Sequence, residues 1–180
     1  FCDLTQGNFK GSDLKGVDLR RAILIGANLS NTNLIGASLS NTNLSGADLS
    51  GANLSNTNLI GANLSNTNLI GADLSGVDIS AAKSSSILAI NTNLTGVNLS
   101  GVDLSNEDLT EVNLSRVDLR NTNLTGTILS YANLTGANLD GVDLSNTDLT
   151  GADLSRVDLR NTNLTGTILS YANLTGANLD

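Results

Sequence analysis

The side chains of this sequence that could do acid–base or covalent chemistry are nearly all carboxylates. The chain of 180 residues contains 17 Asp and Glu, no His and a single cysteine, Cys2. Without His, the usual pairing of a nucleophile with an imidazole base is missing. The carboxylates recur at one fixed position of a repeat, so their pairing carries little information about catalysis. The sequence therefore predicts no catalytic residues, no cofactor and no enzymatic activity.

Metal binding is the other chemistry that these side chains could support. Stacked Asp and Asn oxygens are ligands that Ca²⁺ accepts, but nothing in their spacing singles out a site, and we predict no metal. The glycines are spaced as turn residues and form no phosphate-binding loop. Cys2 cannot form a disulfide within the chain. It occupies a slot where a small, inward-facing residue is expected.

A five-residue unit positions all of these side chains. Counting from Leu4 to Leu179 in steps of five, the central position (position i) is Leu in every unit except four. Position i−1 is Asn or Asp in all units except six, and position i−2 is nearly always small. The four exceptions at the central position are Phe9, Ile79, Ser84 and Ala89. The period is unbroken from one end of the sequence to the other.

The period of five fits neither a helix nor a long strand. Apolar residues at i−2 and i, with one outward residue between them, describe a very short extended segment, because successive side chains point to opposite sides. Gly, Asn and Ser in the remaining positions favour tight turns. Segments and corners that alternate in this way close into a coil, and stacked coils would pair backbone to backbone at about 4.8 Å.

Units such as Gly61-Ala62-Asn63-Leu64-Ser65 resemble the A(D/N)LXX motif of the pentapeptide repeat family. The resemblance covers residues 1–180 as a single domain, apart from 81–90. It implies an all-β, right-handed quadrilateral β-helix, with positions i and i−2 inside, of about 8.5–9 coils of 20 residues. It also makes a bacterial, cyanobacterial origin plausible. The location stays open between the cytoplasm, slightly favoured, and a periplasmic compartment.

Composition and charge limit the partners. The net charge of −8 argues against direct binding to nucleic acid or to an anionic membrane, and permits a basic protein partner. No run is as long as a transmembrane helix and no signal peptide is visible. The start at Phe1, within a repeat and without Met, suggests a trimmed, processed or partial chain.

Departures from the repeat are the places where function is expected. Between Ala81 and Ile90 the motif fails, and the segment is expected either to form a degenerate half coil or to bulge as a loop. Residues 115–140 are identical to residues 155–180, which is an offset of two coils. Glu107 occupies an inward slot, where an unpaired carboxylate is costly. We expect either a local distortion that lets it reach solvent or a raised pKa.

Residues 20 apart should lie in columns on the surface. One column alternates Asp108, Ile128, Asp148 and Ile168, which leaves two isoleucines outside. A second column reads Arg120, Asp140, Arg160 and Asp180, for which we predict an alternating ladder of ion pairs. Tyr131 and Tyr171 share a third column. The candidate interaction residues are Tyr131, Tyr171, Arg120, Asp140, Arg160, Asp180, Ile128, Ile168, Lys83, Ile87 and Leu88.

Three functions remain open from the sequence. The first is a non-enzymatic scaffold that presents regular faces to a protein partner. The second, which the resemblance implies, is an acidic DNA mimic that binds DNA gyrase; interleaved Asn and a core nearly without Phe weaken this reading. The third is self-association into a filament, because coils without caps have open backbone edges.

Overall fold

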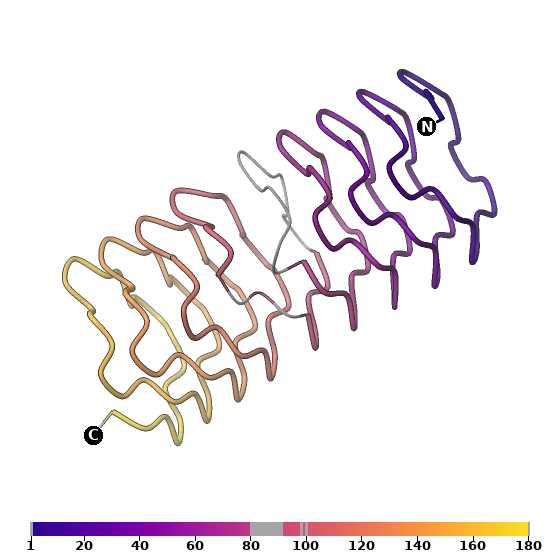
Figure 1. Ribbon diagram of the computed structural model, residues 1–180. Coiled ribbons are helices and arrows are strands. Elements are labelled where there is room, and N and C mark those ends of the chain that lie inside the picture. Colours follow the sequence, from indigo (N-terminus) through magenta and orange to yellow (C-terminus); the bar gives the residue numbers. More distant parts are fainter. Residues whose placement is uncertain (1, 80–91, 98, 100, 180) are drawn as a thin grey trace.

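The computed structural model describes residues 2–79, 92–97, 99 and 101–179. Over these residues the chain winds into closed coils that stack along one axis from the N-terminal to the C-terminal end (Figure 1). Each coil takes 20 residues, since every parallel bridge joins residues 20 apart, as Ile23 joins Asn43. The chain is therefore a solenoid built from the five-residue unit, as the repeat predicts.

The extended segments are as short as the period of five requires. In the described residues the structure contains neither a helix nor a strand longer than one bridging residue, which is always the residue before the central position. Two backbone hydrogen bonds flank each bridge: the N–H of Asn43 donates to the carbonyl of Ala22 at 3.0 Å, and the N–H of Leu24 donates to the carbonyl of Asn43 at 2.7 Å. The sheet order is thus carried between coils and hardly at all along the chain.

A tight turn joins each segment to the next. The N–H of Ala27 donates to the carbonyl of Leu24 at 3.1 Å, which closes a four-residue turn. The third residue of that turn, Gly26, has φ of +62°. Position i+2 has a positive φ at the described corners, occupied by Gly, by Asn or by a few larger residues. A positive φ at only this place defines a type II turn, and Gly and Asn are the residues that tolerate it best.

The core is a stack of leucine layers. The central leucines from Leu24 to Leu154 are almost wholly buried in the described coils, with Ala or Val of position i−2 beside them. Where position i−2 is Thr, its hydroxyl usually reaches the previous coil: that of Thr57 donates to the carbonyl of Leu34 at 2.7 Å. No buried side-chain nitrogen or oxygen among the described residues lacks a partner. The repeat therefore fills its interior without aromatic residues.

Two end residues show how the core adapts. Phe9 takes a central position, and a Cβ added to Gly7 would lie 2.5 Å from Cε2 of that ring, so glycine at 7 makes room for the larger side chain. Cys2 occupies an inward slot, but it is exposed. The prediction of a covered Cys2 is wrong, because in the described structure a neighbouring coil covers only one side of its coil.

The register survives the irregular stretch in the middle of the chain. Asp73 bridges to Asn93, and the hydroxyl of Thr92 donates to the carbonyl of Leu69 at 2.7 Å. The spacing of 20 residues is thus kept from one side to the other. The choice between a half coil and a loop at 81–90, and hence the number of coils, lies outside the described residues.

Candidate functional site

The Asn or Asp at position i−1 has a structural duty that its outward direction does not reveal. Its side-chain oxygen accepts a hydrogen bond from the backbone N–H two residues later, at the start of the turn. Asn28 accepts from Ser30 at 3.0 Å, and Asp73 accepts from Ser75 at 3.0 Å. We call this slot the capping position. This hydrogen bond is the Asx-turn that Asn and Asp favour, and it explains their abundance in this slot without any function.

The capping residues also bind one another along the columns. The amide of Asn163 donates to Asp143 at 3.1 Å, and that of Asn173 donates to Asp153 at 3.1 Å. The predicted interleaving of Asn between Asp is confirmed by these contacts and by the bridges Asp118 to Asn138 and Asn138 to Asp158. Alternation places an amide donor between two carboxylates, which removes the repulsion of like charges directly opposite each other.

Four described units lack an Asn or Asp at the capping position, and two of them are exposed isoleucines. Ile128 and Ile168 are 40% and 50% exposed, on the column where they alternate with Asp108 and Asp148. An isoleucine offers the turn no acceptor. The predicted outward orientation of both isoleucines is confirmed. The other two residues are Ile23 and Ser38, which are both half-buried.

The same two units break a second local rule. Tyr131 and Tyr171 occupy corner positions with φ of 59° and 62°, a left-handed conformation that costs a residue with a side chain about 1–2 kcal/mol. They are 65% and 93% exposed. The ring of Tyr131 lies over the next coil, because a Cβ added to Gly151 would be 2.7 Å from its Cδ1 and Cε1. We call the surface of Ile128, Tyr131, Ile168, Tyr171 and the two aspartates of their column the Ile–Asp face.

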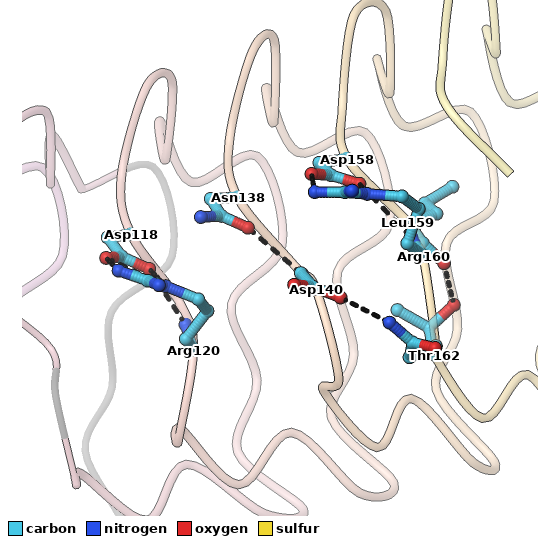
Figure 2. A network of polar contacts seen from close by, with 9 residues as sticks. Asp118, Arg120, Asn138, Asp140, Asp158, Leu159, Arg160 and Thr162 are labelled. Atoms are coloured by element: carbon cyan, nitrogen blue, oxygen red, sulfur yellow. Dashed lines mark hydrogen bonds and ion pairs between the residues drawn. The ribbon is translucent and has the colours of Figure 1, made fainter. Parts of the chain in front are cut away.

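The predicted ladder of ion pairs between coils is wrong. Arg120 pairs with Asp118 of its own coil, with Nη2 2.6 Å from Oδ2, and Arg160 pairs with Asp158 in the same way at 2.7 Å (Figure 2). Asp140 lies between the two arginines and accepts from the amide of Asn161 at 2.8 Å. We call this surface the Arg–Asp face.

The reason for the local pairing is geometric. Residues i−1 and i+1 of one unit point to the same side of an extended segment. The guanidinium of Arg120 can therefore fold back onto the carboxylate that already caps its own N–H, with Nε 2.9 Å from Oδ1. Asp140 then acts only at longer range, raising the pKa of Arg160 after the larger effect of Asp158. These pairs are exposed and each contributes at most about 1 kcal/mol.

The remaining predicted residues divide by their place in the structure. Lys83, Ile87, Leu88 and Asp180 lie outside the described residues. Glu107 is half-buried, yet its backbone keeps regular bonds, with its N–H 3.2 Å from the carbonyl of Leu104 and its carbonyl 3.0 Å from the N–H of Ile128. The expected distortion at Glu107 is therefore absent. No group of three or more His, Cys, Asp or Glu that could hold a metal occurs among the described residues.

Acid will destabilise the protein through its capping aspartates. Hydrogen bonds from Arg20 lower the pKa of Asp18 from 3.8 to about 2, and those from Thr150 lower the pKa of Asp148. A carboxylate with a lower pKa when folded stabilises the fold above its unfolded pKa and loses this contribution as pH falls through the folded pKa. We expect the thermal midpoint to drop between about pH 4 and pH 2. Circular dichroism melts across that range measure this, and an unchanged midpoint would contradict it.

Replacing both exposed isoleucines by asparagine should stabilise the fold. In Ile128→Asn with Ile168→Asn, each new oxygen caps its turn and each new amide faces an aspartate, as Asn163 faces Asp143. A hydrogen bond is worth about 0.5–1.5 kcal/mol net, so we expect the pair to gain about 1 kcal/mol, measured by urea denaturation. Asn123→Ile, which removes the cap on Thr125, is the reverse control and should lose stability. Loss of stability in the asparagine pair would refute the account of the capping position.

A left-open surface on a repetitive solenoid defines a class of protein, the repeat solenoids that are built from five-residue units. The family model of pentapeptide repeats matches in eight copies that together cover residues 1–83 and 90–180. The chain belongs to the pentapeptide repeat family. Within the described ranges there is no helix long and apolar enough to cross a bilayer.

Solved structures of the family are similar to this chain. HetL, a pentapeptide repeat protein involved in heterocyst differentiation regulation in the cyanobacterium Nostoc sp. PCC 7120, is 33% identical over 98% of this chain and 88% of its own, with a TM-score of 0.48. QnrB1, a plasmid-mediated fluoroquinolone resistance protein, is 22% identical over 99% and 89%, with a TM-score of 0.36. A thylakoid-lumen pentapeptide repeat protein of Arabidopsis thaliana is 30% identical over 58% and 66%, with a TM-score of 0.33. None of the curated proteins compared with this chain matches it.

Proposed function

We propose that this protein is a non-enzymatic scaffold that binds a protein partner through its surface, with the Ile–Asp face as the contact. One observation carries the proposal. Exposed isoleucines stand at capping positions, where the fold favours an Asn or Asp oxygen, and exposed tyrosines stand three residues later at corners that favour Gly. Both choices cost folding free energy and neither is needed by the core. An outlier of this kind favours a functional explanation.

The chemistry of the face supports a protein as the partner. Tyr and large apolar side chains are enriched in protein interfaces, and they bury much area at a low cost in side-chain entropy. The unit occurs twice, in the identical segments 115–140 and 155–180, which places the two Ile–Tyr pairs two coils apart. The Arg–Asp face lies on the opposite side, since it is two segments further along a coil of four. There the described arginines Arg120 and Arg160 are neutralised by partners in their own coils.

Binding of the whole chain to an array of purified proteins tests the proposal. The labelled chain is compared with the variant Ile128→Asn/Ile168→Asn, which should be at least as stable. We expect one or more bound proteins whose signal falls about tenfold with the variant. If no bound protein distinguishes this variant, or any variant of the Arg–Asp face, from the unchanged chain, the scaffold proposal fails.

A second candidate is an acidic DNA mimic that binds DNA gyrase. The observation in its favour is the uneven charge, since residues 92–180 hold 11 of the 17 acidic residues and only four of the nine basic ones. Against it, Asp in the columns alternates with Asn or Ile, which keeps the charge density below that of a duplex. A supercoiling assay with purified gyrase tests it. Inhibition that added DNA relieves would support the mimic, and unchanged supercoiling would exclude it.

End-to-end association stays a prediction. Its test is sedimentation of the chain over a range of concentrations, where growth into long species would support it and a constant monomer would oppose it.

A further inference from the structure

The Ile–Asp face has a charge pattern that narrows the choice of partner. Segments 107–111, 127–131, 147–151 and 167–171 stack on one another, as the bridges from Asp108 through Ile128 and Asp148 to Ile168 show. These four segments contain four carboxylates and no Lys or Arg. The carboxylates are those of Glu107, Asp108, Glu111 and Asp148. The face is therefore apolar and acidic, and its complement is apolar and basic.

The order of the side chains along the axis is as informative as their charge. In the central column a carboxylate and an isoleucine alternate at the coil spacing of about 4.8 Å, so like residues recur every 9.6 Å or so. The tyrosines repeat with the same double spacing, each three residues after its isoleucine, and widen the apolar strip at the corner. A partner must therefore present alternating apolar and basic groups about 5 Å apart in one straight line.

An α-helix lying along the solenoid axis meets this spacing. With a rise of about 1.5 Å per residue, side chains three or four residues apart are separated by about 4.5–6 Å, and those seven apart by about 10.5 Å. A tilt of about 20°, common in helix packing, brings the latter figure to the double coil spacing. In an extended strand, side chains on one face repeat at about 6.6 Å and lose register with the column within two residues.

We propose that the Ile–Asp face binds a basic amphipathic helix of its partner, laid along the axis, with apolar residues seven apart on the two Ile–Tyr pairs. Lys or Arg at the intervening positions faces Asp148 and, one step further, Asp108. The inference rests on the proposed scaffold function and names the chemistry of the partner. A second copy of this chain does not supply such a helix, because none occurs in the part of the chain that the structure describes.

The aspartates of this face are suited to an ionic contact. Asp148 accepts hydrogen bonds from Thr150 and from the hydroxyl of Ser130, at 2.6 Å and 3.0 Å, so its carboxylate is held in place. Asp108 is held by Thr110 in the same way, at 2.6 Å. No lysine or arginine lies in the same four segments to compete for either carboxylate. The contrast is Asp118 on the opposite face, whose carboxylate is already paired with Arg120.

A designed peptide tests the inference directly. The probe is a capped alanine-based peptide of about 18 residues, with leucine at every seventh position and arginine three and four residues after each leucine. One control peptide has the same composition in scrambled order, and a second has glutamate in place of arginine. Fluorescence anisotropy of the labelled peptide reports affinity, and circular dichroism reports the helix that binding should induce.

Matched variants of the full chain locate the binding. Ile128→Asn/Ile168→Asn removes the apolar contacts, and Asp108→Asn/Asp148→Asn removes two charges while keeping the capping oxygen. Asp103→Asn/Asp143→Asn removes two charges from the same slot of the neighbouring face and is the control. We expect the first two variants to weaken the leucine–arginine peptide about tenfold each, and the control to change it less than about twofold. The charge variant should also flatten the dependence on salt.

Each outcome decides the inference. Equal binding of the scrambled peptide, equal losses in the control variant, no gain of helix on binding, or no binding near millimolar peptide would each overturn it. If the peptide fails but a protein found on the array is lost with Ile128→Asn/Ile168→Asn, the scaffold function stands and only the basic helix is wrong. If neither the peptide nor any arrayed protein responds to the variants, both proposals fall.

Discussion

Leu134→Ala will lower the free energy of unfolding by about 2–5 kcal/mol, the cost of removing a buried leucine and leaving a cavity. Leu134 is wholly buried, with a leucine layer on each side, Leu114 and Leu154. The interior is close-packed and the coils are tied by hydrogen bonds, so the neighbouring layers cannot collapse into the space. The substitution should also make unfolding less cooperative, because the stability of stacked repeats depends on contacts between neighbours.

The duplication supplies a control that ordinary proteins lack. Leu174→Ala makes the same change in the same local sequence, since residues 155–180 repeat residues 115–140. Leu174 is only partly buried against the core. We expect it to cost less than half as much, about 1–2 kcal/mol, because less apolar area leaves water there on folding. Urea denaturation followed by far-ultraviolet circular dichroism measures both, and equal losses would show that local sequence outweighs stacking.

Gly151→Ala will destabilise the protein by about 2–3 kcal/mol in total, from two separable causes. Gly151 has φ of +66°, where any side chain is strained. Its new Cβ would also meet the ring of Tyr131 at 2.7 Å and displace it from the backbone of the next coil. A ring that is 65% exposed can swing away, which keeps the second cost below that of a clash in the core.

Gly141→Ala separates these two causes. Gly141 lies in the same coil with φ of +73°, and an added Cβ there meets nothing within 4 Å. It should therefore pay only the backbone strain, about 1–2 kcal/mol. In the background of Tyr131→Ala, Gly151→Ala should fall to the cost of Gly141→Ala, a coupling of about 0.5–1.5 kcal/mol. The absence of coupling, measured by thermal or urea unfolding of the four variants, would mean that Tyr131 does not rest on Gly151 in solution.

The same contact recurs with asparagine in place of tyrosine. A Cβ added to Gly51 or to Gly126 would lie 2.6 Å from Oδ1 of the asparagine 20 residues earlier, Asn31 or Asn106. A corner asparagine therefore lies across the next coil and leaves room only for glycine above it. The ten-residue pattern that alternates Gly and Asn at the corners has this steric reason, which the sequence displays but does not explain. Arg21 followed by Asn41 departs from the rule.

Much of the candidate surface could be predicted from position alone. Once the coil has 20 residues, Ile128 and Ile168 must share a column with Asp108 and Asp148, and an outward slot exposes them. Their significance could not be read in this way. It depends on the Asx hydrogen bond, which makes Asn or Asp a structural requirement and an isoleucine there a cost. A frequent Asn or Asp followed two residues later by Ser or Thr is the signal that could have indicated this turn.

The sequence by itself determined the solenoid, because a period of five with two inward residues permits no helix and no long strand, and because one leucine layer packs on the next without specific fitting. The tertiary structure alone decided which partner each polar group takes. Arg120 chooses Asp118 of its own coil over Asp140 of the next, Glu107 reaches its half-buried place without disturbing the backbone, and Cys2 is exposed. These outcomes differ from the column rule because a polar contact depends on side-chain direction and reach, which sequence spacing does not contain, whereas burial of a leucine depends only on which side of the chain it lies.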